Sequence, residues 1–84
     1  MKRLGVIGIV IEGNRDVVAQ VQEILSEYGY LIKGRMGLPD KTNNISIISL
    51  IIEGLNEEIT ALTGKLGRIN RVMVKSALTK ANIE

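Results

Sequence analysis

Hydrophobic residues follow two different periods along the chain, and the changes of period predict its elements. Residues 3–11 and 45–53 are apolar at nearly every position, which is typical of strands that are covered on both faces. Residues 30–38 and 69–78 alternate between apolar and polar side chains, which is typical of strands at the edge of a sheet. The pattern therefore predicts two central strands and two edge strands.

Two segments between these strands repeat their apolar residues with the period of an α-helix. The first helix is predicted over residues 14–28, with Asn14 as its N-cap and Gly29 as a left-handed stop. The second is predicted to begin with Asn56 as its cap and to end at Gly67. Their apolar stripes are expected to consist of Val17, Val18, Val21, Ile24, Leu25 and Tyr28 in the first helix and of Ile59, Leu62 and Leu66 in the second.

The resulting order of elements predicts the ferredoxin-like fold, a βαββαβ two-layer sandwich of the α+β class formed by a single domain over residues 1–84. The usual strand order of this antiparallel sheet is 4-1-3-2. It places the first and third strands at the centre, where the hydrophobic pattern also places them. Two helices cover only one face of such a sheet. The other face is left with Ile and Val side chains, so we expect another copy of the chain to cover it.

The edge strands add basic residues beside this open face. The second strand is expected to carry its apolar side chains on one face and its basic side chains on the other. The expected apolar face consists of Tyr30, Ile32, Met36 and Leu38, and the basic residues expected to flank the open face are Lys33, Arg35, Arg71 and Lys75. These bases are interpreted either as solvated edge residues or as a face that binds an anion or a partner protein.

Composition excludes several classes of function. The chain has no cysteine and no histidine, so it lacks disulfides and the usual ligands of zinc, nickel, copper and iron–sulfur centres, and no cofactor is expected. The usual catalytic bases and nucleophiles are absent for the same reason. Its net charge of +2 is too small to indicate a nucleic-acid partner. No apolar run reaches the roughly 20 residues of a membrane span, so a cytoplasmic protein without membrane contact is expected.

RNA binding and acyl phosphate hydrolysis are two known functions of this fold that can be compared with the sequence. RNA-binding modules stack bases on aromatic residues of the two central strands, and those strands contain no aromatic residue here. Acylphosphatases hold phosphate in the first strand–helix loop with an arginine, and Arg15 lies in the corresponding region. Glu12, however, places a negative charge in that loop, so Arg15 is interpreted as a solvated residue of the first helical turn.

The turn after the first strand is the local feature that best suits a ligand. It consists of Glu12, Gly13 and Asn14. The amides at the start of a helix can receive an anion or a carboxylate, and glycine lets a ligand approach the backbone. Glu12 suits an ammonium group, so a zwitterionic amino acid would satisfy both charges. A helix start without any ligand is the alternative interpretation.

The whole chain resembles a known family, above all in the segment ISIISLIIEGLNEEITALTGKLGRINRVMVKSAL at residues 45–78. The family is that of the putative iron-only hydrogenase system regulators. The resemblance implies an ACT-like fold, similar also to the C-terminal domain of the nickel-responsive repressor. That repressor binds nickel through histidines and a cysteine, which this chain lacks, so nickel binding does not carry over. The repressor's DNA-binding arm is also missing, which argues against direct binding to DNA.

ACT domains commonly self-associate and bind small effectors near the first strand–helix turn, so the resemblance points to Gly13 and Asn14. The sequence thus supports the hypothesis of a non-enzymatic regulatory module that forms homo-oligomers and senses a small anion or amino acid. A protein of the hydrogenase system is the partner that the resemblance implies. The alternatives are a structural or adaptor subunit of another protein and an acylphosphatase-like hydrolase.

Overall fold

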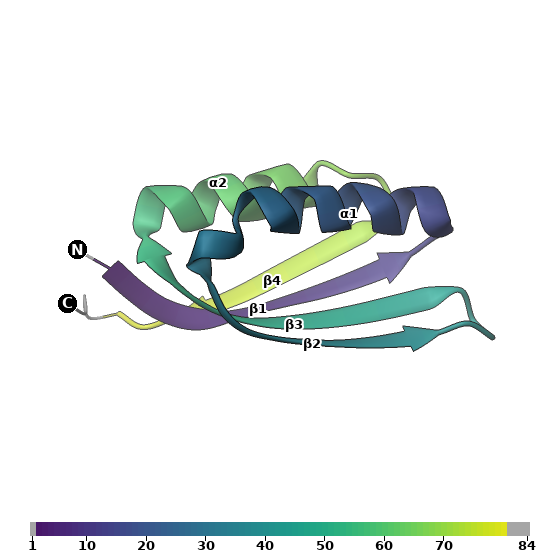
Figure 1. Cartoon of the computed structure of the whole chain (residues 1–84), viewed down its shortest axis with the longest axis horizontal. Coiled ribbons are helices and arrows are strands. Elements are labelled where there is room, and N and C mark those ends of the chain that lie inside the picture. The colour runs from purple at the N-terminus through teal and green to yellow at the C-terminus, as the bar shows by residue number, and fades with distance from the viewer. Residues whose placement is uncertain (1, 81–84) are drawn as a thin grey trace.

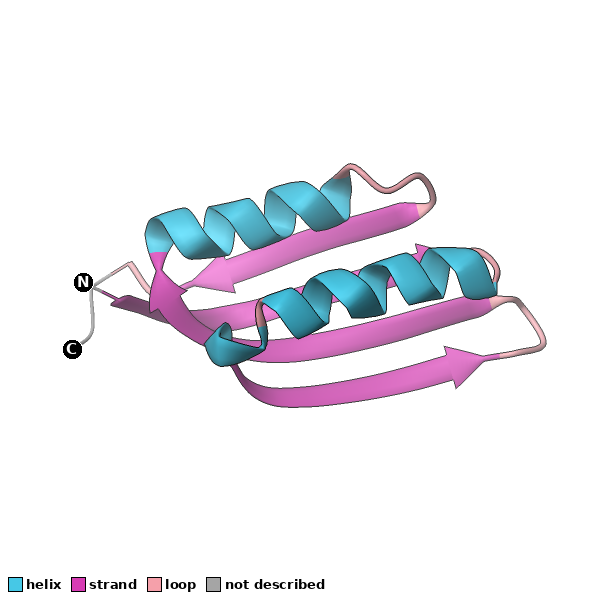
Figure 2. Ribbon diagram, turned by 45° about the horizontal axis from the view of Figure 1, so that its top comes forward, coloured by secondary structure: helices cyan, strands magenta, loops and turns pink. Residues whose placement is uncertain are grey.

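Both helices lie on one side of a four-stranded antiparallel sheet in the computed structural model, which describes residues 2–80 (Figures 1 and 2). The strand order β2-β3-β1-β4 confirms the predicted order 4-1-3-2 and the predicted βαββαβ fold. The elements are β1 (Lys2–Glu12), α1 (Arg15–Glu27), the 3₁₀ turn η1 (Gly29–Leu31), β2 (Ile32–Asp40), β3 (Ile45–Leu55), α2 (Asn56–Gly67) and β4 (Val72–Leu78).

The two central strands are paired along their whole length, from Lys2 opposite Leu55 to Glu12 opposite Ile45. The midpoint of this pairing is Ile7 opposite Leu50. Because side chains alternate along a strand, odd-numbered residues of β1 and even-numbered residues of β3 face the helices. The remaining residues of both strands face away from the helices, on the side that we call the open face.

The core lies between the helices and the sheet and is wholly aliphatic. The predicted stripes of both helices are confirmed, since Val21 and Leu25 of α1 and the three stripe residues of α2 are buried. No described residue with a polar or charged side chain is buried. The core consists of Ile7, Ile9, Ile11, Val21, Leu25, Leu31, Ile48, Leu50, Ile52, Ile59, Leu62, Leu66 and Val72.

The bounds of α1 agree with the prediction, but the way the helix ends does not. Asn14 is the N-cap, and its side-chain oxygen accepts hydrogen bonds from the backbone N–H groups of Asp16 (3.1 Å) and Val17 (3.4 Å). The left-handed stop at Gly29 is wrong, because no described glycine has a positive φ. The chain instead continues from the helix into η1, where the Leu31 N–H donates to the Tyr28 carbonyl at 2.9 Å. This tight turn buries Leu31 in the core.

The cap of α2 also differs from the prediction. Leu55 is the N-cap and Asn56 is the first helical residue. The Glu58 carboxylate accepts a hydrogen bond from the backbone N–H of Leu55 at 3.1 Å, which is the carboxylate half of a capping box, and Leu55 has no side-chain acceptor to supply the other half. The first turn of the helix is acidic, with Glu57 and Glu58.

A β-bulge corrects the predicted faces of β2. The register of β2 against β3 shifts between Ile32 and Gly34, so the side-chain alternation changes phase there. Ile32 lies opposite Ile52 and packs against the core, whereas Met36 and Leu38 lie on the open face. A regular strand would have placed all three on one face, and Tyr30 belongs to η1 rather than to the strand.

Strand ends differ from the predicted bounds because pairing across the sheet extends or shortens them. β2 and β3 continue through Asp40 and Leu55, beyond the predicted ends at residues 38 and 53. β4 begins only at Val72, and the Val72 N–H donates to the Ile69 carbonyl at 3.2 Å in the preceding turn. Arg71 has a φ of 73° in that turn, a conformation that non-glycine residues seldom adopt.

Replacing Gly64 with alanine is expected to stabilise the protein by about 0.5–1 kcal/mol. Gly64 lies inside α2 with a negative φ, and an added Cβ would meet no atom within 4 Å, so only the gain in helix propensity remains. Urea denaturation of Gly64→Ala beside the parent protein measures the change. Gly29→Ala is the matched control, because its Cβ would also meet nothing but lies outside the helices, and it should gain less. A loss of stability in Gly64→Ala would contradict this account.

Candidate ligand-binding turn and its surroundings

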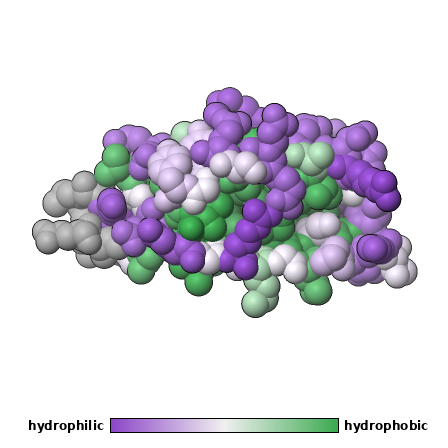
Figure 3. Space-filling view, in the orientation of Figure 1, coloured by the Kyte–Doolittle hydropathy of each residue, from purple (hydrophilic) through white to green (hydrophobic). Residues whose placement is uncertain are grey.

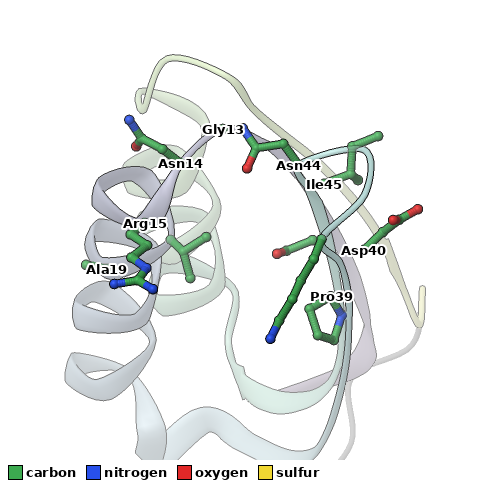
Figure 4. Close-up of a pocket in the computed structure, with 11 residues that line it drawn as sticks. Gly13, Asn14, Arg15, Ala19, Pro39, Asp40, Asn44 and Ile45 are labelled. Carbon is green, nitrogen blue, oxygen red and sulfur yellow. The ribbon is translucent and has the colours of Figure 1, made fainter.

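The turn at Gly13 and Asn14 borders a cleft between the start of α1 and the hairpin that joins β2 to β3. The cleft has a volume of about 540 Å³, which falls in the range of small-molecule sites. Figure 4 shows Asn14, Arg15 and Ala19 on the α1 side and Pro39, Asp40 and Ile45 on the hairpin side. Its lining residues are Gly13, Asn14, Arg15, Val18, Ala19, Pro39, Asp40, Lys41, Asn44, Ile45 and Ser46.

A second, smaller hollow of about 290 Å³ adjoins the same turn. Gly13, Asn14 and Asn44 line both hollows, and Val17 and Arg71 complete the second one. Asn44, at the end of the hairpin, has a φ of 56°, in the left-handed region that asparagine tolerates better than most residues. The Gly13–Asn14 turn is therefore the wall between two hollows at one end of the molecule.

Three cations from three separate segments surround this turn. Arg15 and Lys41 line the larger cleft, and Arg71 lines the smaller hollow. The carboxylate of Asp40 points away from Arg15 (Figure 4). It is bonded to Asn43, whose side-chain and backbone N–H groups donate at 2.9 and 3.2 Å and hold the pKa of Asp40 below its ordinary value. The charge facing the hollows is thus mainly positive.

The helix amides that were expected to be free for a ligand are largely occupied. The N–H groups of Asp16 and Val17 are hydrogen-bonded to the side chain of Asn14, and the N–H of Val18 donates to its carbonyl at 3.2 Å. As the N-cap, Asn14 therefore occupies amides that an anion would otherwise bind. Any anion at this turn has to be held mainly by the surrounding cations.

Glu12, the third member of the predicted ligand turn, lines neither hollow. It is the last residue of β1 and lies on the open face opposite Ile45, and its N–H donates to the Arg71 carbonyl at 2.9 Å. Strand alternation turns its side chain away from the side on which α1 begins. The structure therefore does not bring the Glu12 carboxylate together with Gly13 and Asn14.

Gly13 is required by close packing and not by an unusual backbone conformation. Its φ is not positive, and a Cβ added there would lie 3.0 Å from Val17 Cγ2 and 3.5 Å from Arg71 Cδ. The absence of a side chain lets Val17 and Arg71 approach the backbone from both sides. A bulky replacement such as valine would crowd both residues, so it would not test ligand binding cleanly.

The four basic residues expected to flank the open face are dispersed. Lys75, opposite Gly8, lies on the open face. Arg35 lies opposite Leu50 on the helix side, where its guanidinium donates a hydrogen bond to the Gln22 side chain. Lys33 lies at the β2 bulge and Arg71 at the smaller hollow. The bulge and the turn before β4 separate residues that simple alternation would have aligned.

Sequence reasoning missed the hairpin side of the cleft. The sequence analysis assigns no function to residues 39–44, yet Lys41 and Asn44 line the cleft, and Ser46 follows them from β3. Arg15 was interpreted as a solvated residue, and it lines the cleft as well. The one available signal was that order 4-1-3-2 places the β2–β3 hairpin and the start of α1 at the same end of the sheet.

A second polar cluster joins the two helices. Lys65 Nζ lies 3.4 Å from the Glu27 carboxylate and 5.1 Å from the centre of the Tyr28 ring, which stacks on Tyr30. The hydrogen bond with Tyr28 and the charge of Glu27 raise the pKa of Lys65. Desolvation and the neighbouring Glu58 raise the pKa of Tyr30. Lys65 and Glu27 are exposed and Glu58 is half-buried, and the Lys65–Glu27 pair links the two helices.

Neither a metal cluster nor a membrane helix is found among residues 2–80. No group of three or more His, Cys, Asp or Glu side chains in this part of the chain could hold a metal ion. No helix there is long and apolar enough to cross a membrane.

Comparison with known families finds one that matches nearly the whole chain. The TM1266-like family, described as "Iron-only hydrogenase system regulator, putative", matches residues 3–76. No protein of curated function matches the sequence at a significant level.

Solved structures extend this similarity. The uncharacterized protein TM1266 from Thermotoga maritima is 38% identical, with a TM-score of 0.90 over 95% of this chain and 100% of that chain. The ACT domain of the GTP pyrophosphokinase of Chlorobium tepidum is 24% identical, with a TM-score of 0.76 over 92% of this chain and 100% of that one. A formyltetrahydrofolate deformylase from Pseudomonas putida KT2440 is 9% identical, with a TM-score of 0.63 over 88% of this chain and 28% of that one. The last two similarities concern the fold alone, which is ACT-like.

Proposed function

The chain belongs to the TM1266-like family of putative iron-only hydrogenase system regulators, and from this premise we propose that it is a non-enzymatic ACT-like module that senses a small anionic ligand and self-associates. The observation that carries the ligand-sensing proposal is the convergence of Arg15, Lys41 and Arg71 around the Gly13–Asn14 turn. These cations come from segments far apart in the sequence.

The chemistry of the two hollows favours a small carboxylate or phosphate-like anion, or an amino acid bound through its carboxylate. Guanidinium and ammonium groups donate charge-assisted hydrogen bonds to such oxygens. The side chains of Asn44 and Ser46 add neutral donors and acceptors at the hairpin side. An amino acid would place its ammonium group near these oxygens, since Glu12 lies on the other side of the sheet.

A regulatory role without catalysis agrees with the residues around the cleft. Its lining contains neither a nucleophile paired with a base nor a pair of carboxylates, because Asp40 is the one acidic lining residue. Arg15 and Lys41 can hold an anion, but Asp40, the one lining carboxylate that could activate water, is bonded to Asn43 and points away from Arg15. An acylphosphatase-like hydrolase would need that second function, and an acyl phosphate hydrolysis assay on the purified protein tests it directly.

Replacing Arg15 with glutamine is expected to weaken binding of an anionic effector at least about tenfold. A charge-assisted hydrogen bond contributes roughly 1.5–3 kcal/mol, and 1.4 kcal/mol is a factor of ten in affinity. A thermal-shift screen against amino acids, nucleotides and inorganic anions first identifies the effector. Titration calorimetry then compares Arg15→Gln with the parent protein, and Lys41→Gln is expected to behave in the same way.

Lys33→Gln is the matched control, because it removes the same charge from the β2 bulge, which lines neither hollow. Its affinity for the effector should equal that of the parent. An effector that binds Arg15→Gln and Lys41→Gln with unchanged affinity would place the site elsewhere. A screen without any effector, together with a stable complex with a hydrogenase-system protein, would favour the adaptor role instead.

A further inference from the structure

The open face of the sheet carries nearly all of the large apolar side chains that the described residues expose. Eight such side chains are exposed, and seven of them lie on this face, while Tyr30 lies in η1. In the orientation of Figure 3, hydrophobic atoms project from the lower edge, on the side of the sheet that faces away from the helices. The seven are Leu4 (37% exposed), Val6 (47%), Met36 (76%), Leu38 (68%), Ile47 (46%), Ile51 (51%) and Met73 (52%).

Strand register arranges these side chains as two ridges with a trough between them. Val6 and Ile51 are paired and form the first ridge, and Leu38, Ile47, Val10 and Met73 form the second in an unbroken row of partners. The row between them has Ser49 and Gly8 at its centre. A Cβ at Gly8 would meet only the Lys75 carbonyl oxygen, at 3.9 Å, so the floor of the trough is open.

We infer that a second copy of this chain covers the open face, with the two sheets stacked and the strands of the copies antiparallel. A two-fold interface requires a surface that is complementary to itself, and a ridge beside a trough of the same width meets that requirement. Successive rows lie about 7 Å apart, so a shift by one row brings the Val6–Ile51 ridge onto the Gly8–Ser49 trough of the other copy.

The length of the central strands supports this arrangement. β1 and β3 each contain 11 residues, with Ile7 and Leu50 paired at their centres. A two-fold axis that passes through this midpoint, in the plane of the interface and perpendicular to the strands, lays β1 and β3 of one copy over the same strands of the other copy along their full length. The same axis produces the shift by one row. The overlapping sheets, four strands wide, would measure roughly 600–700 Å² in projection. This approaches the surface of about 800 Å² per partner in a standard interface.

Lys2 and Glu12, at the two ends of the face, fit the same axis, and Lys2 Nζ also lies 4.0 Å from the Glu53 carboxylate of its own chain. Lys2 begins β1 and Glu12 ends it, and both lie on the open face. Antiparallel stacking about Ile7 places Lys2 of each copy over Glu12 of the other. It also places Lys75 over Ala77 instead of over a second Lys75, because these residues lie one row apart on β4. A parallel arrangement would instead place the two Lys2 ends at one end of the interface and the two Glu12 ends at the other.

This inference specifies the interface of the self-association proposed above and does not depend on the ligand-binding cleft. Light scattering and sedimentation of the full chain at micromolar concentration should show a dimer or a larger even oligomer. Ile51→Lys should raise the dissociation constant of the dimer by about 100-fold or more, because it places a charge into the trough of the partner. Tyr30→Lys is the matched control, since it converts an exposed large side chain (63% against 51% for Ile51) outside the open face, and it should leave the dimer intact.

A charge exchange tests the antiparallel arrangement itself. Glu12→Lys should weaken the dimer several-fold by facing Lys2 of the partner, and addition of Lys2→Glu to the same chain should restore most of the affinity. Circular dichroism confirms that each variant is folded. A monomeric parent protein, or a dimer that survives Ile51→Lys, would overturn the inference. An effector that still binds Ile51→Lys would show that ligand sensing stands independently of this interface.

Discussion

Val21→Asp is expected to unfold the protein. Val21 has no exposed surface at the centre of the α1 stripe, and no polar or charged side chain is buried among the described residues to pair with a carboxylate. Burying an unpaired carboxylate costs several kcal/mol. Native proteins have in total only about 5–15 kcal/mol of stability, and a domain of this size lies toward the lower end. Loss of far-UV circular dichroism and of a cooperative melting transition is the expected result.

Gln20→Asp is the control for this experiment. Gln20 is the preceding residue of α1 and is exposed, so the substitution has the same effect on charge and a similar effect on helix propensity without burial. Its melting temperature should stay close to that of the parent. A folded Val21→Asp protein with an unchanged melting temperature would mean that α1 packs through a different face.

Gly5→Ala is expected to destabilise the protein by about 2–3 kcal/mol, although it adds only one methyl group. Gly5 lies opposite Leu78. An added Cβ would overlap the carbonyl oxygen of Ala77 and would lie 2.5 Å from Leu78 Cδ2 and 3.0 Å from Leu78 Cα. Because the obstacle includes the backbone of β4, the end of that strand would have to move away from β1. A fall of roughly 8–20 °C in melting temperature corresponds to this loss.

Gly8→Ala separates this close contact from the general effect of replacing glycine in a strand. Gly8 is on the same strand and opposite the same neighbour, β4, but its Cβ would meet no atom nearer than 3.9 Å. Because Gly8 lines the trough of the open face, both variants are compared in the monomeric Ile51→Lys background, where the stability of Gly8→Ala should equal or slightly exceed that of Ile51→Lys alone. Hydrogen exchange of the β4 amides should accelerate in Gly5→Ala and not in Gly8→Ala. Equal stability of the two variants would contradict the account.

Side-chain periodicity was enough to predict most of the fold. The apolar runs at residues 3–11 and 45–53 and the stripes of both helices appear in the structure as the central strands and the buried helix faces. These features are local, because the spacing of apolar residues along one element determines which of its faces can leave water. The topology followed because few arrangements of βαββαβ bury both helix stripes against one sheet.

Features that depend on pairing between distant segments were not predictable in the same way. The bulge in β2 changes which face Ile32 occupies, and no local pattern indicates a register shift of one residue. Gly5 appears in the sequence as an ordinary glycine in a strand, and only the approach of β4, over 70 residues later, makes it necessary. The cap at Leu55 likewise depends on where pairing with Lys2 ends β3.

The candidate site likewise contains residues that a local pattern indicates and residues that only the tertiary structure brings to it. The sequence alone indicated Gly13 and Asn14, because a helix start after a glycine is a local signal. It could not assign Arg15, Lys41 and Arg71 to the same turn, nor place Glu12 on the opposite side of the sheet. Local hydrophobic spacing thus determined the elements, their buried faces and their order. The tertiary structure decided the register, the close glycine contact and the cation cluster, because these depend on distances between residues that only the folded chain brings together.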